Sequence, residues 1–337
     1  MADYRAIKGL NIQSVSSDNA TIQLGDIWYN STLGKIRVGK TSAAAWASGG
    51  NLNIAREGNM GAGTQTSGLT TGGLASDPSP IGAPGGWVYG TETYDGSSWT
   101  EVADLNQGRG YAGGCGTQTA ALVNGGHYHP VNNPTTTLSE EYDGSSWTEG
   151  NNMNTARYAV RDCGTQTSAL AAGGHLGPPG YSNSAEEYDG TSWTAGGNLG
   201  TARYESHVFG TQTAGACSGG MGAPGGATLD FMEEYDGTSW SEVTNAPRVN
   251  GFSSAWGTQT DGITVSGGNP LTAECMTYDG TNWSTTTDYP AATRRLGAAT
   301  AAPTSAGLAF GGATPSLTTA TNEFTGAGVE AANVTTS

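Results

Sequence analysis

The chain has 337 residues, of which 55 are glycine and only 12% are charged, and its net charge is −16. Such an acidic surface repels nucleic acid and anionic membranes, so neither is expected as a partner. The first 20 residues lack the apolar core of a secretory signal, and no apolar stretch is long enough to span a bilayer. We therefore expect a chain that is not inserted in a membrane.

Residues 1–43 do not share the pattern of the rest of the chain. Apolar runs at 22–24 and 27–29 predict strands, and the turn sequence at 30–35 predicts a small hairpin with a further strand at 36–38. This segment has five basic residues against three acidic ones, whereas the remainder is strongly acidic. We interpret it as an attachment segment, and the alternative is an extra hairpin that packs on the rest of the protein and has no further role. Its candidate contact residues are Ile27, Trp28, Tyr29, Lys35 and Arg37.

One pattern is repeated six times between residues 44 and 326. Each copy has a Trp, an Arg, a Gly-Thr-Gln-Thr, a Gly-Gly pair and a Tyr-Asp-Gly that leads to the next Trp, although the sixth copy has lost both the Gly-Thr-Gln-Thr and the Tyr-Asp-Gly. The repeat length is typical of a propeller or a solenoid. The tryptophans, expected in the core of each unit, are Trp46, Trp99, Trp147, Trp193, Trp240 and Trp283. The arginines, expected to form a structural ring, are Arg56, Arg109, Arg157, Arg203, Arg248 and Arg294.

The segments between these marks predict strands. Runs such as 120–123 and 308–310 are bounded by Gly and Thr and are too short for helices. No window has a sustained apolar period of 3.6 residues, so the fold class is all-β. The Asp-Gly of each Tyr-Asp-Gly predicts a type I′ hairpin, because both central positions of that turn need a positive φ. Each copy is then a four-stranded sheet.

The first and last copies are incomplete in complementary ways. Residues 322–326 imitate a third strand but no Trp follows them, whereas Trp46 has no Tyr-Asp-Gly before it. We expect the strand around Trp46 to pair with the strand around Phe324, which would close the array and remove its exposed edges. Residues 327–337 are left as a C-terminal tail.

The combination of Gly-Gly, Tyr and Trp in each copy resembles the kelch repeat over residues 44–326. The resemblance implies a six-bladed kelch-type β-propeller, a ring of radial four-stranded blades around a central channel, here following a small N-terminal β-hairpin segment. The chain departs from that family mainly in its high content of Gly, Ser and Thr.

The arginine column has two interpretations. Six-bladed sialidases hold a carboxylate with an arginine cluster, but a catalytic cluster is expected to break the repeat symmetry. An Arg in every copy indicates a structural role, with backbone carbonyls or neighbouring acids as partners. The alternative is an anion-binding ring near one mouth of the channel. The candidate acidic partners are Glu140, Glu141, Glu186, Glu187, Glu233 and Glu234.

Histidines and cysteines do not predict a cofactor. The four histidines are His127, His129, His175 and His207. His127 and His129 lie on one side of an extended segment, which would hold a metal only weakly, and the ligand set of copper oxidases built on kelch propellers is not recognisable. Four cysteines without a close pair favour buried free thiols. We find no nucleophile elbow, phosphate loop or catalytic dyad, so the expectation is a protein without a cofactor and without enzymatic activity.

The connections between the Gly-Gly pair and the next Tyr vary in length, and the first four are longer. They are rich in aromatic residues, Pro and Gly, a composition suited to recognition on a rigid scaffold, although they can also be tolerated insertions. The candidate binding residues in these loops are Trp87, Tyr89, His127, Tyr128, His129, His175, Tyr181 and Phe231.

Residues 25–36 resemble a segment that recurs in bacteriophage virion proteins, particularly fibre and adhesin-like chains. We therefore expect a non-enzymatic virion structural protein of the tail or head, assembled in the host cytoplasm. Residues 1–43 would contact other virion proteins, and the propeller would face outward, where it could bind a glycan or protein of the host surface. The alternatives are a capsid decoration protein without a receptor and, less favoured, a carbohydrate-active propeller enzyme.

Overall fold

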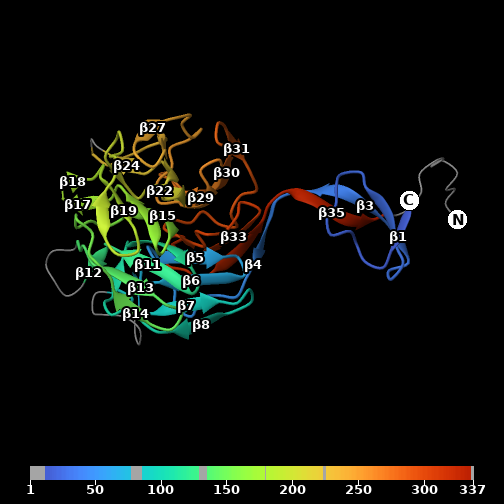
Figure 1. The fold of residues 1–337 in the computed structure, drawn as a ribbon, viewed down its shortest axis with the longest axis horizontal. Helices are drawn as coiled ribbons and strands as arrows, with labels where there is room; N and C mark the ends of the chain where they lie inside the picture. Colours follow the sequence, from blue (N-terminus) through green and yellow to red (C-terminus); the bar gives the residue numbers. More distant parts are fainter. Residues whose placement is uncertain (1–11, 77–85, 129–134, 179, 223–224, 335–337) are drawn as a thin grey trace. The chain divides into compact units, whose positions relative to one another are not determined.

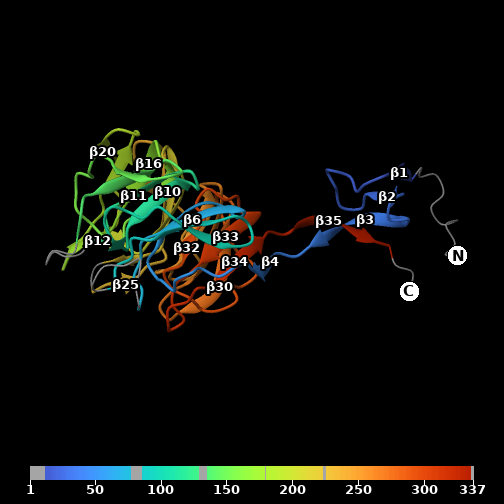
Figure 2. The same cartoon turned by 90° about the horizontal axis from the view of Figure 1, so that it is seen from below.

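The computed structural model describes residues 12–76, 86–128, 135–178, 180–222 and 225–334. In this part of the chain the protein is all-β, with strands and turns and no helix. It divides into two compact units (Figures 1 and 2). The smaller unit combines Met1–Ala45 with Thr325–Ser337, and the larger unit is Trp46–Phe324.

The smaller unit is one sheet with the strand order β1 (Gln13–Val15), β2 (Ile27–Asn30), β3 (Lys35–Ser42) and β35 (Gly328–Asn333). Strands β2 and β3 form the expected hairpin, and β1 runs parallel to β2. The C-terminal segment, expected to be a separate tail, instead supplies β35, which pairs antiparallel with β3 over six residues. Both ends of the chain therefore build this unit.

The strand expected at residues 22–24 is not formed. The side chain of Asp26 accepts a hydrogen bond from the backbone N–H of Gln23 at 2.9 Å, and the N–H of Asp26 donates to the carbonyl of Gln23 at 3.1 Å. These two bonds fold the segment into a turn ahead of β2. An apolar run of three residues is too short to outweigh such local pairing.

The larger unit contains, among its described residues, six four-stranded antiparallel sheets that follow the six sequence copies. Sheets 1 and 2 consist of β5 (Met60–Thr64), β6 (Ser67–Thr71), β7 (Thr91–Tyr94) and β8 (Trp99–Val102), and of β10 (Gly113–Thr117), β11 (Ala120–Asn124), β13 (Ser139–Tyr142) and β14 (Trp147–Glu149). Sheets 3 and 4 consist of β15 (Arg161–Thr165), β16 (Ser168–Ala172), β19 (Ala185–Tyr188) and β20 (Trp193–Ala195), and of β22 (His207–Thr211), β23 (Ala214–Ser218), β26 (Met232–Tyr235) and β27 (Trp240–Glu242). Sheets 5 and 6 consist of β28 (Ser254–Thr258), β29 (Asp261–Gly267), β30 (Thr272–Tyr278) and β31 (Trp283–Thr285), and of β32 (Gly297–Ala298), β33 (Ala306–Phe310), β34 (Thr321–Thr325) and β4 (Ala45–Ser48).

The first strands of the six sheets contact one another in a closed cycle. Strand β5 contacts β10, and the series continues through β15, β22, β28 and β32 back to β5. Strand β33 also lies beside β5 (Figure 1). Sheet 6 is completed by β4 from the start of the unit, where the N–H of Gly49 donates to the carbonyl of Thr321 at 2.9 Å. This arrangement is compatible with a propeller.

Short extra strands in the connections between the second and third strands of sheets 2 to 4 pair with one another or with a short strand that precedes the sheet. Strand β9 (Arg109–Gly110) pairs with β12 (His127–Tyr128), and β17 (His175–Gly177) pairs with β18 (Gly180–Tyr181). A third group joins β21 (Arg203–Tyr204), β24 (Met221–Gly222) and β25 (Ala227–Thr228). The candidate binding loops are thus partly ordered by sheet pairing.

The hairpins at Tyr-Asp-Gly are not of type I′, and that prediction is wrong. Tyr94 pairs with Trp99, so four residues form the loop, and only Gly96 has a positive φ, of 92°. The carboxylate of Asp95 accepts hydrogen bonds from the N–H groups of Ser97 and Ser98, both at 2.8 Å. The Asp side chain therefore replaces the backbone geometry that a two-residue turn requires. The same carboxylate contacts occur at Asp143, Asp189, Asp236 and Asp279.

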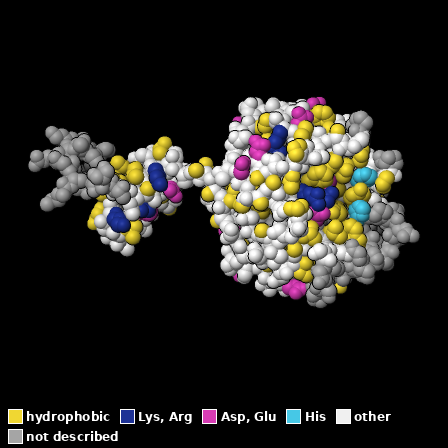
Figure 3. All heavy atoms as spheres, turned by 180° about the vertical axis from the view of Figure 1, so that it is seen from behind, with side chains coloured by type: hydrophobic (Ala, Val, Ile, Leu, Met, Phe, Trp, Pro, Cys, Tyr) yellow, Lys and Arg dark blue, Asp and Glu magenta, His cyan; other side chains and the backbone are white. Residues whose placement is uncertain are grey.

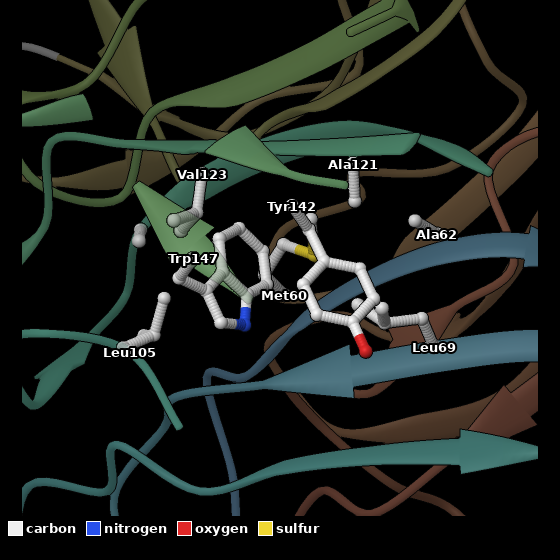
Figure 4. Close-up of a cluster of buried hydrophobic side chains, with 9 residues drawn as sticks. Met60, Ala62, Leu69, Leu105, Ala121, Val123, Tyr142 and Trp147 are labelled. Atoms are coloured by element: carbon white, nitrogen blue, oxygen red, sulfur yellow. The ribbon is translucent and has the colours of Figure 1, made fainter. Parts of the chain in front are cut away.

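The core lies between successive sheets. Figure 4 shows one such layer, where Met60 and Leu69 of sheet 1 pack against Val123, Tyr142 and Trp147 of sheet 2. Aromatic pairs between the third and fourth strands contribute to each layer, with ring centroids 4.9–5.1 Å apart. The six pairs are Tyr94–Trp99, Tyr142–Trp147, Tyr188–Trp193, Tyr235–Trp240, Tyr278–Trp283 and Phe324–Trp46. All four cysteines are buried and free.

Candidate functional site

Four of the six column arginines are buried at equivalent positions in sheets 1 to 4. Arg157 represents them: its Nη1 donates to the carbonyls of Gly173 at 3.1 Å and Ser184 at 2.6 Å, and its Nη2 donates to Glu186 at 3.1 Å. The other oxygen of Glu186 accepts two hydrogen bonds from Asn154, from its backbone N–H at 2.7 Å and its side chain at 2.9 Å. The equivalent ion pairs are Arg56–Glu92, Arg109–Glu140 and Arg203–Glu233.

Arg248 and Arg294 lie elsewhere. The carbonyls of Arg109, Arg157 and Arg203 accept from the second Gly of the preceding Gly-Gly pair, and in sheets 5 and 6 the residues in this place are Asn250 and Thr293. Asn250 accepts from Gly220 at 2.6 Å. Thr293 accepts at 2.9 Å from Gly267, the first Gly of its pair, because an irregularity in β29 shifts the register there.

The buried ion pair is therefore replaced as a unit in sheets 5 and 6. Where sheets 1 to 4 have Glu, two positions before the aromatic residue of the third strand, sheet 5 has Met276 and sheet 6 has Asn322. Both are buried. Arg248 pairs instead with Glu274, and the half-exposed Arg294 lies 3.3 Å from Glu57.

The glutamine of Gly-Thr-Gln-Thr links each of sheets 1 to 5 to the sheet before it in the cycle. Gln118 of sheet 2 donates from Nε2 to the carbonyls of Gly68 at 3.1 Å and Tyr94 at 2.7 Å in sheet 1. Gln65 of sheet 1 donates to the carbonyl of Phe324 in sheet 6 at 2.8 Å. Sheets 3 to 5 use Gln166, Gln212 and Gln259 in the same way. The motif is thus explained by the joining of neighbouring sheets.

One end of the space between the sheets is closed by a ring of backbone hydrogen bonds. Each sheet contributes one residue with a positive φ of 50–62°, and its N–H donates to the carbonyl of the residue from the preceding sheet at 2.7–3.2 Å. The six residues are Gly58, Tyr111, Ala159, Glu205, Phe252 and Arg295. The bond from Gly58 to Arg295 closes the ring. We call this ring the mouth.

The side chain of Arg295 extends across the mouth. Its Nε donates to Glu205 at 2.9 Å and its Nη1 to Glu57 at 3.2 Å, so it joins sheet 6 to sheets 4 and 1. The guanidinium carbon lies 4.8 Å from the ring centre of Tyr111 and 5.0 Å from that of Phe252. Burial acts to lower the pKa of Arg295, but Glu205, Tyr111 and Glu57 outweigh it and the pKa is raised. This side chain is therefore a fixed cation.

A small cavity lies among the first strands of all six sheets. Its volume is about 50 Å³, enough for water but far below the size of a site for a small organic ligand, roughly 300 Å³ or more. Asp162 lines it and is fully buried, with neither carboxylate oxygen hydrogen-bonded within the described residues. Burial raises the pKa of Asp162 to about 7, with Arg157 opposing the shift. His207 also lines the cavity, and burial lowers its pKa to about 3.

Beside the mouth, seven aromatic side chains form a continuous series, which we call the aromatic arc. Its members are Trp87, Tyr111, His127, Tyr158, His175, Tyr181 and Tyr204. Three pairs are stacked: Trp87 with His127 at 5.4 Å, Tyr158 with His175 at 4.8 Å, and Tyr181 with Tyr204 at 5.2 Å between ring centroids. All except the buried His175 are partly exposed. On the face of the larger unit in Figure 3, Lys or Arg atoms lie among hydrophobic side chains, with histidines nearby.

The structure brings together four of the eight predicted binding residues: Trp87, His127, His175 and Tyr181. Tyr89 instead packs against the core of sheets 1 and 2. Phe231 uses its backbone carbonyl to accept from Arg203 at 3.1 Å and is not in the arc. Tyr128 is placed only through its backbone, which pairs with Arg109, and His129 lies outside the described residues.

Sequence reasoning missed Tyr111, Tyr158 and Tyr204. Each follows a column arginine by one or two residues, and this common spacing was the available signal. The mouth orients these tyrosines, because the backbone adopts a positive φ two residues after each of the arginines that precede them. They therefore lie beside the longer loops that carry the other members of the arc.

The histidines of the arc are neutral at pH 7. Burial lowers the pKa of His127 to about 4 and also lowers the pKa of His175. The Nδ1 of His175 accepts from the N–H of Gly177 at 2.9 Å, so its proton is on Nε2. Among the described residues, no group of three or more His, Cys, Asp or Glu could hold a metal ion. The chemistry of this face is thus stacking, hydrogen bonding and the charge of the arginines.

The candidate attachment residues have different environments. Trp28 is 1% exposed and donates from Nε1 to Asp18 at 3.1 Å, while Arg37 forms an ion pair with Asp18 at 2.8 Å, so both stabilise the smaller unit itself. Ile27 and Tyr29 are each 39% exposed, and Lys35 is exposed. Four further apolar residues of the unit are also exposed, namely Leu24, Leu33, Val329 and Val334.

Comparison with known proteins gives no assignment. No family model matches the chain, and no curated protein matches it. No helix in the described ranges is long and apolar enough to span a bilayer.

Proposed function

We propose that the larger unit is a six-bladed kelch-type β-propeller and that the chain is a non-enzymatic bacteriophage virion protein of fibre or adhesin type. The smaller unit attaches the protein to the particle, and the propeller faces outward and binds a molecule of the host surface. The observation that carries the recognition role is the aromatic arc beside the mouth.

The propeller assignment is supported by the cyclic order of the sheets. Six four-stranded sheets contact one another in sequence, and both the backbone ring and the Gln65 bond to Phe324 join the last sheet to the first. The closing strand β4 leaves sheet 6 with four strands like the others. A ring of this kind has only short exposed edges.

The recognition role is supported by composition and rigidity. Tyr, Trp and Arg are the residues that dominate binding energy at interfaces, and here they are partly exposed on one contiguous surface. Ring stacking and the bonds of the mouth fix these side chains before a ligand arrives, so little conformational entropy is lost on binding. If the longer loops were only tolerated insertions, there would be no reason for seven aromatic rings to be in contact.

The attachment role is supported by the smaller unit. Six of its apolar side chains are exposed on a small unit, which favours a partner surface. Residues 25–36, which resemble a segment of phage virion proteins, include three of these side chains: Ile27, Tyr29 and Leu33. The unit also carries the local excess of basic charge, which suits an acidic particle surface.

A non-enzymatic role is supported by the arginines. In sheets 1 to 4 they are buried, and their terminal N–H groups bind backbone carbonyls and a buried carboxylate, so they are not accessible to a substrate. The cavity below the mouth has room for water alone. A carbohydrate-active enzyme would need an accessible acid pair, which the mouth does not offer because Glu57 and Glu205 are both held by Arg295.

The experiment is to locate the chain in purified particles of a phage that encodes it. Mass spectrometry should detect the protein in the particles, and antibodies against residues 46–324 should decorate intact particles in electron micrographs. Antibodies against residues 12–42 should not decorate them until the particles are disrupted. Recovery of the chain only in the particle-free fraction would refute the proposal.

A further inference from the structure

We infer that the aromatic arc, together with Arg294 and Arg295, is a binding site for an acidic glycan, that is, an oligosaccharide with sugar carboxylates. This inference rests on the proposed recognition function and names the ligand class of the same surface. It follows from three properties of the described residues: the polar atom on every ring, the unused donors, and the local sign of charge.

Every ring of the arc carries a polar atom. Four members are tyrosines, two are histidines and one is tryptophan, and none is phenylalanine. Sugars present apolar C–H faces bordered by hydroxyl groups, and partly exposed amphipathic rings offer both an apolar surface and a hydrogen-bonding edge. Tyr, Trp and Arg also occur at protein interfaces, so it is the unused polar atoms of these rings, rather than the ring types, that favour a sugar.

The arc has hydrogen-bonding capacity that the protein itself does not use. The hydroxyls of Tyr158, Tyr181 and Tyr204 make no hydrogen bond within the described part of the chain, and each can both donate and accept. Arg295 donates from Nε and Nη1 but not from Nη2 to described residues, and Arg294 interacts only through Nε. Both arginines therefore keep donors for a ligand.

The local charge favours an anion although the chain is acidic. Three arginines (Arg161, Arg294 and Arg295) meet two glutamates (Glu57 and Glu205) at the mouth, which leaves one net positive charge. Guanidinium groups bind carboxylates through paired N–H donors. The neutral histidines add no charge at pH 7.

The test uses the full chain and a panel of uronic-acid and sialic-acid tetrasaccharides. Each acid is paired with its methyl ester, which keeps the sugar rings and removes the charge. Binding is measured by isothermal titration calorimetry and by the fluorescence of tryptophan, since Trp87 belongs to the arc. At least one acidic tetrasaccharide should bind, and its ester should bind at least tenfold more weakly.

Two variants address the two parts of the surface. Tyr181→Ala removes a stacked ring and Arg294→Gln removes an exposed guanidinium, and each should weaken binding of the acid at least tenfold. Only Arg294→Gln should also reduce the difference in binding affinity between the acid and its methyl ester. The matched controls are Tyr29→Ala and Lys35→Gln in the smaller unit, which should bind as the wild type does.

The outcomes separate the ligand class from the proposed function. Binding of no panel member, or equal binding of acid and ester, would overturn the acidic glycan. A protein ligand would be indicated if attachment to host cells were lost after protease treatment but not after periodate oxidation, and this result would also overturn it. In each of these cases the presence of the chain in the virion would still stand, because particle composition tests it separately.

Discussion

The hydroxyl of Tyr94 in sheet 1 donates a hydrogen bond to Glu323 in sheet 6 across 2.6 Å. The same bond joins successive sheets elsewhere, as from Tyr278 in sheet 5 to Glu234 in sheet 4 at 2.8 Å. The bond from Tyr94 therefore joins the last sheet to the first, as the equivalent bonds join consecutive sheets. A residue near the C-terminus of the larger unit is held by one near its beginning.

Removal of this hydroxyl should weaken the closure. We expect Tyr94→Phe to lower the free energy of unfolding by about 1–2 kcal/mol, because a hydrogen bond to a charged group is lost. The measurement is urea denaturation followed by tryptophan fluorescence. Tyr142→Phe is the matched control. The position of sheet 1 that corresponds to the Glu partners in the other sheets is Thr93, so the hydroxyl of Tyr142 has no hydrogen-bond partner within the described residues. Equal losses in the two variants would contradict the role of the bond.

The buried ion pairs give a second prediction. Arg157→Ala leaves Glu186 charged and unpaired in the interior, and should lower the free energy of unfolding by about 3–5 kcal/mol. The double variant Arg157→Asn, Glu186→Met copies the residues that sheet 5 has at these positions, and should recover at least half of this loss. Thermal and urea unfolding measure both. A double variant as unstable as the single one would show that the pair is not replaceable as a unit.

Asp162 predicts a dependence of stability on pH. Its pKa in the folded protein is about 7, above the ordinary value of 3.8. Between these values the unfolded chain loses the proton and the folded chain keeps it, so stability falls as pH rises from 4 to 7. The wild type should lose more stability than Asp162→Asn over this range, by up to about 4 kcal/mol. Denaturant unfolding at pH 4.5 and pH 7.5 tests this, and parallel curves for the two proteins would refute it.

The repeat made much of the fold predictable. Strands, hairpins and the Tyr–Trp pairs follow from a pattern that recurs six times, and the orphan Trp46 indicates where the last sheet finds its fourth strand. The side-chain turn at Asp95 was not predictable from Asp-Gly alone, because that dipeptide fits both a type I′ turn and a longer loop capped by the carboxylate. The pairing of β35 with β3 joins sequence ends that share no pattern.

The candidate site was less predictable because it depends on small shifts of register. Arg248 and Arg294 fit the sequence column, but their spacing to the mouth differs. The mouth residue follows Arg157 by two positions, Arg248 by four and Arg294 by one. Arg295 was consequently overlooked beside Arg294. The aromatic loops could be recognised by composition. The tyrosines that complete the arc could be found only once the positive-φ residues of the mouth placed them.

The smaller unit supplies the last prediction. In β2 the exposed residues Ile27 and Tyr29 alternate with the buried Trp28 and Asn30, so one face of the strand can be changed without loss of the sheet. If this face attaches the protein to the particle, Ile27→Ser, Tyr29→Ser should reduce the amount of chain that sediments with particles at least tenfold. Its melting temperature should stay within a few degrees of the wild type, because exposed positions contribute less than about 0.5 kcal/mol each.

Trp28→Ala is the control with the opposite signature. It removes a buried side chain and its hydrogen bond to Asp18, so the smaller unit should lose roughly 3–5 kcal/mol of stability, with any loss of attachment secondary to unfolding. Sedimentation of particles that lack the native chain, mixed with each purified variant, gives the attachment, and circular dichroism gives the melting temperature. A stable double-serine variant that still sediments with particles would place the attachment surface elsewhere. Lys35→Gln leaves this apolar face intact. If Lys35→Gln still sediments with particles and the double-serine variant does not, apolar contact rather than charge makes the main contribution to attachment.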